Sequence, residues 1–504
     1  MKCNFVFQAK RSVFPGRVGQ ALPVGCHHHS FFMSNPQSSS PSRITGIDSN
    51  LHCLLGFGVF NALSFTLVLG TPMVLMAKYL GANQAVLGVF LALCPLLALL
   101  QIPAAGIAKR WGLKKLFLSG WGGRTCVLVL LVPVPLLVGK APSWVLLWWW
   151  MAAMIAFNTS RGFASGAWLP WLTEIVPAGQ RGRYLSWENI VVNAGSLLSM
   201  LAFALLMPTR EGEHPQGWMY AAMVGVSAAF GMISLWFVSK APGGAPAPMA
   251  QQRIWFDRER YREAWAEPDF RRIVRFGIWQ SLALGAFGGF VIVYIKDVLK
   301  VPDGMTLYFS ISTLVGSMVA AAVVSRLLDR TGGRPVLRCG SVAMLLLLVA
   351  WTLNADNKLW FSSFAIAMQF FLIGFAGTAV GIPQTRLLMA ACPPAAKTEG
   401  MTIYQVGTAL AGGLSPLAWG FLLERMKEPG AKHPGSEAYV VFFGTTALML
   451  FFLQSLVSRL REQQAMSTRE FLGTVIVGTP LRLVADIADT PRFLIEKIRH
   501  LNDD

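Results

Sequence analysis

The sequence predicts an all-α polytopic membrane protein with twelve transmembrane helices, and three observations predict it. Of the 504 residues, 54% are hydrophobic and only 13% are charged, whereas about a quarter of the residues of a soluble domain are charged. The apolar residues occur in blocks of about twenty or more, the length that a helix needs to cross a bilayer. The net charge of +18 comes from basic residues in loops between these blocks, which indicates membrane topology and not a nucleic-acid-binding face.

Twelve apolar blocks predict two sets of six spans. The first six cover about 53–77, 85–107, 116–139, 144–172, 188–208 and 218–239, and the last six about 272–295, 304–326, 336–355, 359–388, 399–424 and 438–459. The blocks divide the chain into a disordered N-terminal tail (1–50), an N-terminal six-helix bundle (51–239), a central loop (240–271), a C-terminal six-helix bundle (272–459) and an amphipathic tail (460–504). In the central loop we expect a charged helix over 253–265.

The basic residues predict the orientation of the chain. Counted from Met33, roughly 28 Lys and Arg lie on the side that carries both termini, and about 9 lie on the other side. The positive-inside rule then places both termini and the central loop in the cytoplasm. We expect an integral protein of the bacterial inner membrane. The run Trp148-Trp149-Trp150 falls near the outer end of the fourth span, where an aromatic belt belongs.

The two halves of the chain repeat each other. The first span of each half starts near residue 53 or 272, an offset of about 219. The loops after the second and eighth spans align at Arg110 and Arg330, and the segments 174–183 and 391–400 align at nearly the same offset. An offset that holds at three places indicates a duplicated six-span unit, as transporters often contain.

The two aligned loops carry a motif. Residues 105–116 read AGIAKRWGLKKL and residues 325–337 read SRLLDRTGGRPVL. They resemble the loop signature G-x-L-x-D-R-x-G-R-R of the major facilitator superfamily. The second loop matches it at four positions and the first at two, and we expect these to form the conformational switch loops: Arg110, Gly112, Asp329, Arg330, Gly332 and Arg334. Glycine permits a tight turn between two helices, and an acidic residue is stabilised near a helix N-terminus or an arginine.

The resemblance implies a gradient-driven transporter of a small solute that works by alternating access between two six-helix bundles. Its partners would be the solute and the lipid bilayer, and we expect a monomer. The sequence contains no nucleotide-binding loop, no nucleophile elbow and no metal-ligand spacing. We therefore expect neither an enzyme nor a bound cofactor, metal or nucleic acid. Its seven cysteines have no CxxC spacing and predict no disulfide framework.

The chain departs from the family pattern in ways that leave a second interpretation open. Lys109 stands where the first loop should carry its acid, and the Gly-Pro-x-x-Gly-Gly run of antiporters is missing from the fifth span. The missing run weighs against a drug–proton antiporter. The altered first loop and the lack of a central acid fit a non-transporting relative that serves as a membrane assembly or sensor protein. No carboxylate lies in the middle of any predicted span, which favours facilitated diffusion, exchange or coupling that rides on the solute.

Two basic residues lie well inside predicted spans, Arg124 in the third and Arg161 in the fourth. A charge inside the bilayer is costly, so each is a candidate functional residue. The resemblance implies that the fourth span lines the central cavity and that the third packs outside it, which favours Arg161 for substrate binding. A lone arginine in a cavity without acids suits an anionic solute. The alternative is an internal ion pair of Arg161 with Glu174 or Glu188.

Uncharged polar residues inside the spans complete the candidate substrate site: Asn61, Gln280, Gln369 and Gln405. The resemblance favours the first three, because it implies that the first, seventh and tenth spans line the cavity. The structural alternative is that these amides hydrogen-bond between helices.

Two further features lie near the cytoplasmic surface. Trp168 and Trp171 flank Pro170 near the inner end of the fourth span, where they form an inner gate or pack against neighbours. In the C-terminal tail, Thr490 to Leu501 predicts an amphipathic helix on the membrane surface, with Pro491 at its first helical position.

Overall fold

The computed structural model describes residues 49–176, 181–210, 212–243, 258–356, 362–426 and 436–460, together with 462, 466, 467, 470 and 471. The chain divides into two units, 1–47 and 48–504, and only the second contains described residues. The predicted disordered tail and the predicted amphipathic helix from Thr490 to Leu501 lie outside the described residues.

The first half of the described chain forms eight α-helices and one short 3-10 helix. The helices are α1 (Ser49–Leu69), α2 (Thr71–Tyr79), α3 (Gln84–Ala98), α4 (Gln101–Trp111), α5 (Leu113–Leu131), η1 (Val134–Leu137), α6 (Ser143–Ile175), α7 (Arg181–Leu206) and α8 (Gly217–Ser239).

The second half begins with a short charged helix, α9 (Arg258–Ala266), which confirms in part the helix predicted over 253–265. The helices that follow are α10 (Pro268–Leu284), α11 (Phe287–Asp297), α12 (Asp303–Thr331), α13 (Gly333–Ala355), α14 (Ser363–Ala391), α15 (Lys397–Arg425) and α16 (Ser436–Ser458).

Each of the twelve predicted spans contains one or two of these helices. Ten helical spans among the described residues are long and apolar enough to cross a membrane, and α1 with α2 makes an eleventh that bends by 40°. The twelfth is α6, whose 33 residues exceed the length that a bilayer requires. Its Trp148-Trp149-Trp150 run and Asn158 lower its hydropathy. The predicted fold class is therefore confirmed.

Three spans break where the sequence interrupts helical hydrogen bonding. Between α1 and α2, Gly70 has an extended backbone and Pro72, which has no N–H, follows within the first turn of α2. Between α3 and α4, the chain bends at Leu99 and Leu100, shortly after Pro95 inside α3. The first span of the second half breaks near the matching place, between α10 and α11 at Gly285.

The repeat predicted from the sequence extends to the backbone conformation of its turns. Gly112 joins α4 to α5 with φ of 85° and ψ of 152°, and Gly332 joins α12 to α13 with φ of 82° and ψ of 169°. Only glycine adopts this region readily. One residue therefore suffices to turn the chain in each half, as the loop signature predicts.

Close packing repeats in the same way. A Cβ atom added to Gly120 of α5 would lie 2.6 Å from the carbonyl oxygen of Ser160 on α6. A Cβ atom on Gly340 of α13 would lie 3.1 Å from the carbonyl carbon of Ala379 on α14. Each glycine lets two helices touch through their backbones, which is how helices associate inside a membrane.

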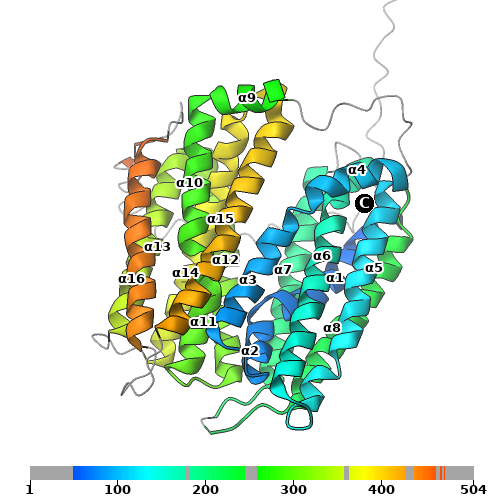
Figure 1. Cartoon of the computed structure of the whole chain (residues 1–504). Coiled ribbons are helices and arrows are strands. Elements are labelled where there is room, and N and C mark those ends of the chain that lie inside the picture. Colours follow the sequence, from blue (N-terminus) through cyan, green and yellow to red (C-terminus); the bar gives the residue numbers. More distant parts are fainter. Residues whose placement is uncertain are drawn as a thin grey trace, which may run out of the picture. The chain divides into compact units, whose positions relative to one another are not determined.

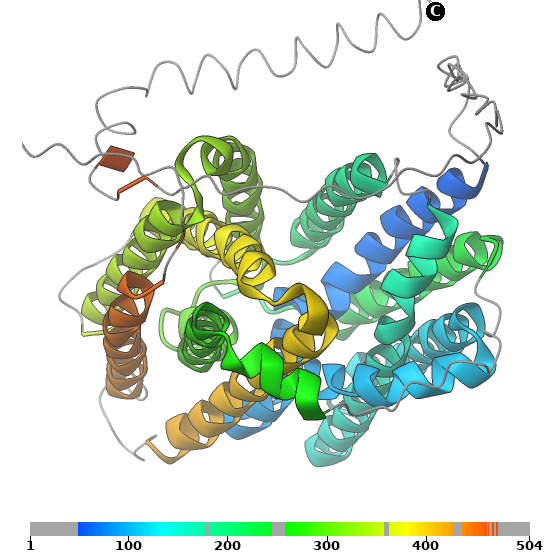
Figure 2. The ribbon, with the colours of Figure 1, turned by 90° about the horizontal axis from the view of Figure 1, so that it is seen from above.

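Two sets of helices result, and they lie side by side (Figures 1 and 2). In the first set, α1 packs on α7 and α8, and α5 packs on α6 and α8. In the second set, α12 and α13 pack on α14, and α10 packs on α15 and α16. The sets meet where α3 contacts α15, α7 contacts α12, and α2 contacts α11 and α12. We call the two ends of the molecule the α2–α11 end and the α4–α9 end, after the helices at each end in Figure 1.

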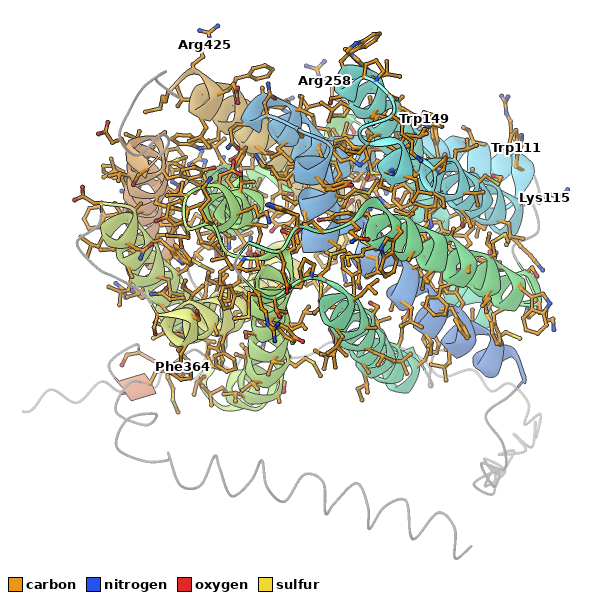
Figure 3. The ribbon with its side chains drawn as sticks, turned by 90° about the horizontal axis from the view of Figure 1, so that it is seen from below. Trp111, Lys115, Trp149, Arg258, Phe364 and Arg425 are labelled. Carbon is orange, nitrogen blue, oxygen red and sulfur yellow. The ribbon has the colours of Figure 1, made fainter. Side chains whose placement is uncertain are left out.

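The outer surface of both sets is apolar. Trp148, Leu205 and Phe364 are 70%, 70% and 76% exposed, and the labelled side chains of Trp149 and Phe364 lie at the periphery in Figure 3. Large apolar side chains exposed around a helical bundle are those that contact lipid.

The backbone of Gly332 predicts a stability effect. Gly332→Ala should lower the unfolding midpoint of the purified protein, since a side chain at this φ and ψ costs about 1–3 kcal/mol. The matched control is Gly381→Ala in α14, where an added Cβ meets no atom within 4 Å and replacing a helical glycine is stabilising. Thermal unfolding in lipid nanodiscs measures both. Equal midpoints for the two variants would contradict the role of this turn.

Candidate functional site

The two helix sets are in closest contact at the α2–α11 end, between α3 and α15. A Cβ atom on Gly88 would lie 2.8 Å from the Cα of Gly420, and one on Gly420 would lie 2.7 Å from the Cα of Gly88. No side chain separates the helices at this point. Polar groups on either side are thereby brought within hydrogen-bond distance of each other.

Asp297, the last residue of α11, accepts two bonds from the other set. Lys78 Nζ lies 2.7 Å from Asp297 Oδ2, and Gln84 Nε2 donates to the same oxygen at 3.0 Å. The backbone N–H of Gln84, at the start of α3, donates to Glu424 Oε2 on α15 at 2.8 Å. Gln84 is 1% exposed, so these bonds satisfy its side-chain and backbone N–H groups, which water does not reach.

A second acid, Asp303 at the start of α12, makes a parallel connection. Its side chain is 2% exposed. Tyr220 on α8 donates its hydroxyl to Asp303 Oδ2 at 2.6 Å, and Lys296 forms an ion pair with the other carboxylate oxygen. The next residue, Gly304, donates its backbone N–H to the carbonyl oxygen of Pro208 at 2.9 Å. The bonds to Tyr220 and Pro208 join the two helix sets at the α2–α11 end, whereas the ion pair with Lys296 lies within the second set.

A cavity of about 360 Å³ lies between the two sets beside these contacts. A hydrogen bond of 2.7 Å between Thr71 on α2 and Ser310 on α12 crosses its wall. The lining is mostly aromatic and aliphatic with a few hydroxyl groups: Phe65, Thr66, Leu69, Gly70, Thr71, Met200, Phe287, Gly288, Val291, Ile292, Ser310, Thr313, Leu314, Phe370 and Ile373. Its volume lies within the range of small-molecule sites.

Arg161, the predicted substrate-binding residue, is half-buried on α6 and faces α3. Its Nη2 donates to the carbonyl oxygen of Cys94 at 2.9 Å and to Cys94 Sγ at 3.2 Å. Its Nε is buried and has no hydrogen-bond partner in the part of the chain that the structure describes. Within the same residues Arg161 forms no ion pair with Glu174 or Glu188.

Asn61, predicted to contact the solute, binds protein groups instead. Its side-chain oxygen accepts from Trp121 Nε1 at 3.1 Å and from Arg124 Nη2 at 2.5 Å. Arg124 is 1% exposed and therefore lies inside the first helix set. The structure thus joins Asn61 to the charged residue that the resemblance placed outside the cavity.

None of the three predicted glutamines forms a hydrogen bond with Asn61 or Arg161 among the described residues. Gln405 on α15 is exposed, and its Oε1 accepts a long bond of 3.4 Å from Gln101 of α4, across the boundary between the sets. Gln369 on α14 has a buried Oε1 without a partner among the described residues, and Gln280 on α10 is half-exposed. None of the five predicted residues lines the 360 Å³ cavity.

The switch loop of the second half is held by an acid from beyond the last span. Glu462 accepts from the backbone N–H groups of Gly333 and Arg334 at 3.1 and 2.8 Å, which are unpaired donors at the start of α13. Arg334 donates its Nη2 to the carbonyl oxygen of Ser458 at 3.0 Å. A negative charge is favourable at a helix N-terminus. In the first half, Arg110 is exposed; the side chains of Lys109, Asp329 and Arg330 lie outside the described residues.

The two tryptophans near the inner end of the fourth span pack within the first helix set. Trp171 is fully buried and donates to the carbonyl oxygen of Pro242 at 3.0 Å. The ring of Trp168 lies 4.9 Å from that of Phe57 and 5.0 Å from that of Phe117. The sequence left open whether Trp168 and Trp171 form an inner gate or pack against neighbours, and the contacts in the structure are packing contacts.

The acids at the α2–α11 end are functional candidates that the sequence analysis missed, because they lie at span ends. One signal could have found them. Lys78 and Asp297 are 219 residues apart, which is the offset of the internal repeat. Opposite charges at matching positions of two repeats indicate a pair that meets across the boundary between them.

The family model of the Major Facilitator Superfamily matches residues 53–416. The chain belongs to this superfamily. The match spans the two helix sets and both glycine turns, from the start of α1 to the middle of α15. It makes the chain a membrane transporter by family, and the predicted resemblance is confirmed.

Solved structures of superfamily members share the fold. A mutant of the nucleoside transporter NupG is 14% identical with a TM-score of 0.63, and the match covers 81% of this chain and 99% of that chain. A bacterial homologue of the iron transporter ferroportin in an inward-facing state is 12% identical with a TM-score of 0.62, covering 82% and 97%. A D-xylose-proton symporter is 15% identical with a TM-score of 0.59, covering 80% and 96%. None of the curated proteins matches the sequence.

Proposed function

We propose that this chain is a gradient-driven transporter that carries a small solute across the membrane by alternating access. The observation that carries the proposal is the closed α2–α11 end beside a cavity of about 360 Å³ between the same two helix sets. Among the described residues, the bonds that join one set to the other at this end are all non-covalent. Rocking of the sets can therefore exchange these contacts for water and open the cavity on this side.

The proposed energy source is a solute gradient. The sequence has no nucleotide-binding loop, and no carboxylate lies in the middle of a span. Facilitated diffusion or exchange needs neither of these. Coupling to a proton through a buried acid is therefore not part of the proposal.

The proposed orientation places the α4–α9 end and both termini in the cytoplasm, in a bacterial inner membrane. Basic residues at the α4–α9 end support it: Arg110, Lys114, Lys115, Lys240, Arg258, Arg260, Arg262, Arg271, Arg272 and Arg275. In this orientation the outer end is the closed one, so the structure would represent an inward-facing state. The ferroportin homologue, similar in fold, is described in that state.

The orientation has a direct test in reporter fusions. We expect fusions at Gly243 and at the C-terminus to report the cytoplasmic side, because an even number of spans precedes each of them. A fusion at Glu213 should report the outer side, because an odd number of spans precedes it. Paired alkaline phosphatase and fluorescent-protein fusions measure this. A fusion at Gly243 that reports the outer side would invert the proposed topology.

The proposed solute is anionic and is held by Arg161. The similar structures include a nucleoside transporter, a homologue of an iron transporter and a D-xylose symporter, whose solutes do not belong to one chemical class. We therefore infer the solute class from this chain's own residues. Arg161 is half-buried inside a span, forms no ion pair within the described part of the chain and has an unpartnered Nε. A carboxylate or phosphate oxygen would satisfy that donor.

The second candidate function is that of a non-transporting membrane assembly or sensor protein. Lys109 at the acidic position of the first loop is the observation that favours it. Such a protein would bind a partner or a ligand without net movement of solute.

Arg161 variants test both the solute and the function. We expect Arg161→Lys to express normally and to lose about tenfold or more in affinity, because lysine keeps the charge but not the planar fork, and a hydrogen bond to a charged group contributes about 1.5–3 kcal/mol. The matched control is Arg275→Lys, at an exposed position near the middle of α10. The measurement is uptake by proteoliposomes from a panel of labelled sugars, nucleosides, carboxylates and phosphate esters.

Two results would contradict these proposals. An Arg161→Lys variant with unchanged uptake of an anion would remove Arg161 as its anchor. Absence of net uptake of any panel member by the unmodified protein, with binding retained, would favour the non-transporting candidate.

A further inference from the structure

Arg124 is a fully buried cation with an incomplete set of partners. It lies in the middle of α5, is 1% exposed and forms one described hydrogen bond, to Asn61. Its Nε and Nη1 atoms are buried and have no hydrogen-bond partner among the described residues. Three aromatic rings surround its guanidinium carbon, those of Trp121 at 4.4 Å, Phe157 at 5.7 Å and Phe65 at 5.8 Å.

The aromatic rings do not account for this charge. A cation over an aromatic face gains about 2 kcal/mol when desolvated, whereas a buried charge without a counter-ion costs more than that. An amide oxygen such as that of Asn61 is neutral. Within the described residues, no carboxylate forms an ion pair with Arg124.

Arg161 is a second cation at the interface between α5 and α6. Helices α5 and α6 touch where a Cβ atom on Gly123 would lie 3.2 Å from Ser160 Oγ, and Arg124 and Arg161 are the residues that follow these two. Phe157, whose ring lies 5.7 Å from the guanidinium carbon of Arg124, precedes Arg161 by four residues on α6, so the two residues share one face of that helix. The interface therefore holds two like charges that repel each other.

The unfilled donors of the two arginines point to a specific kind of ligand. Arg124 Nε and Nη1 and Arg161 Nε are three buried N–H donors without acceptors in the described part of the chain. Two positive charges are neutralised by two negative charges. Guanidinium groups match the several oxygens of an oxyanion in geometry.

We propose that Arg124 and Arg161 together bind a doubly negative oxyanion group, of the phosphate or sulfate kind. The statement that this group belongs to the transported solute rests on the proposed function; the binding itself does not. Arg161, which is half-exposed, is the residue that an entering anion meets first, and Arg124 is the deeper anchor.

The cavity adjoins this site through one side chain. The ring of Phe65 lines the 360 Å³ cavity and also lies 5.8 Å from the guanidinium carbon of Arg124. A solute whose anionic group lies at the arginines can therefore place an apolar part toward the cavity. Phe157 lies on Arg124 at nearly the same distance but is not part of the cavity lining.

The experiment measures anion-dependent thermal stability of the purified full-length chain in nanodiscs, without any gradient. Sodium sulfate is titrated against sodium acetate and sodium chloride at equal ionic strength. The variants are Arg124→Gln and Arg161→Gln, and the control is Arg275→Gln, at an exposed position near the middle of α10. Sulfate also stabilises folded proteins in general through exclusion from their surface, so the signal is the saturable part that differs between the unmodified protein and the variants.

We expect sulfate to raise the unfolding midpoint of the unmodified protein and of Arg275→Gln saturably, and more than acetate or chloride does. Both other variants should lose this increase and keep only the general salt effect. If Arg124→Gln does not fold, Arg161→Gln decides the result. An equal increase in the unmodified protein and in Arg161→Gln would overturn the site, and an equal saturable increase with acetate or chloride would overturn its preference for a dianion. Retained binding without proteoliposome uptake would instead contradict only the proposed transport.

Discussion

The backbone contact between α3 and α15 at Gly88 and Gly420 is the constraint on which the closed end depends. With no side chain between the two helices, Lys78 and Gln84 of one helix set come within hydrogen-bond distance of Asp297 in the other. Gln84 is almost completely buried, so its N–H groups need acceptors within the protein. The closed end is therefore held by a small number of directional bonds, and a rigid rotation of one set breaks them together.

The internal repeat explains why one rotation is enough. Gly112 and Gly332 turn the chain with nearly the same backbone angles at matching positions. Lys78 and Asp297 occupy matching positions as well. Two similar rigid bodies that meet at equivalent residues can exchange one contact surface for another, which is the symmetry that transporters of this kind use.

The sequence predicted the features that local chemistry determines. The length of the apolar blocks predicted the spans. The glycine in each loop predicted the turns, because a turn made by one residue at positive φ requires glycine. Contacts between distant segments were not predictable from such patterns. Glu462, for example, caps Gly333 from 129 residues away, and an acid in a polar tail carries no sign of its partner.

In the candidate site, too, contacts between distant segments could not be predicted from the sequence. The cost of a charge in a bilayer identified Arg124 and Arg161 as functional candidates, but only the structure shows that Asn61 hydrogen-bonds to Arg124. Periodicity gives the helix on which a residue lies and not its neighbours on other helices. The family resemblance assigned roles by span, and it placed the span of Arg124 outside the cavity. The structure instead buries Arg124 among aromatic rings, one of which also lines the cavity.

We propose that the two helix sets alternate between closure at one end and closure at the other. The most direct measurement is the distance between paired spin labels, with Glu213 and Glu437 at the α2–α11 end and Lys115 and Arg275 at the α4–α9 end. The Asp297→Asn variant weakens the closing contacts. In a fraction of the variant molecules, the distance between the labels at Glu213 and Glu437 should become longer. In the same fraction, the distance between the labels at Lys115 and Arg275 should become shorter. Unchanged distances at both pairs, or lengthening at both, would contradict alternating access.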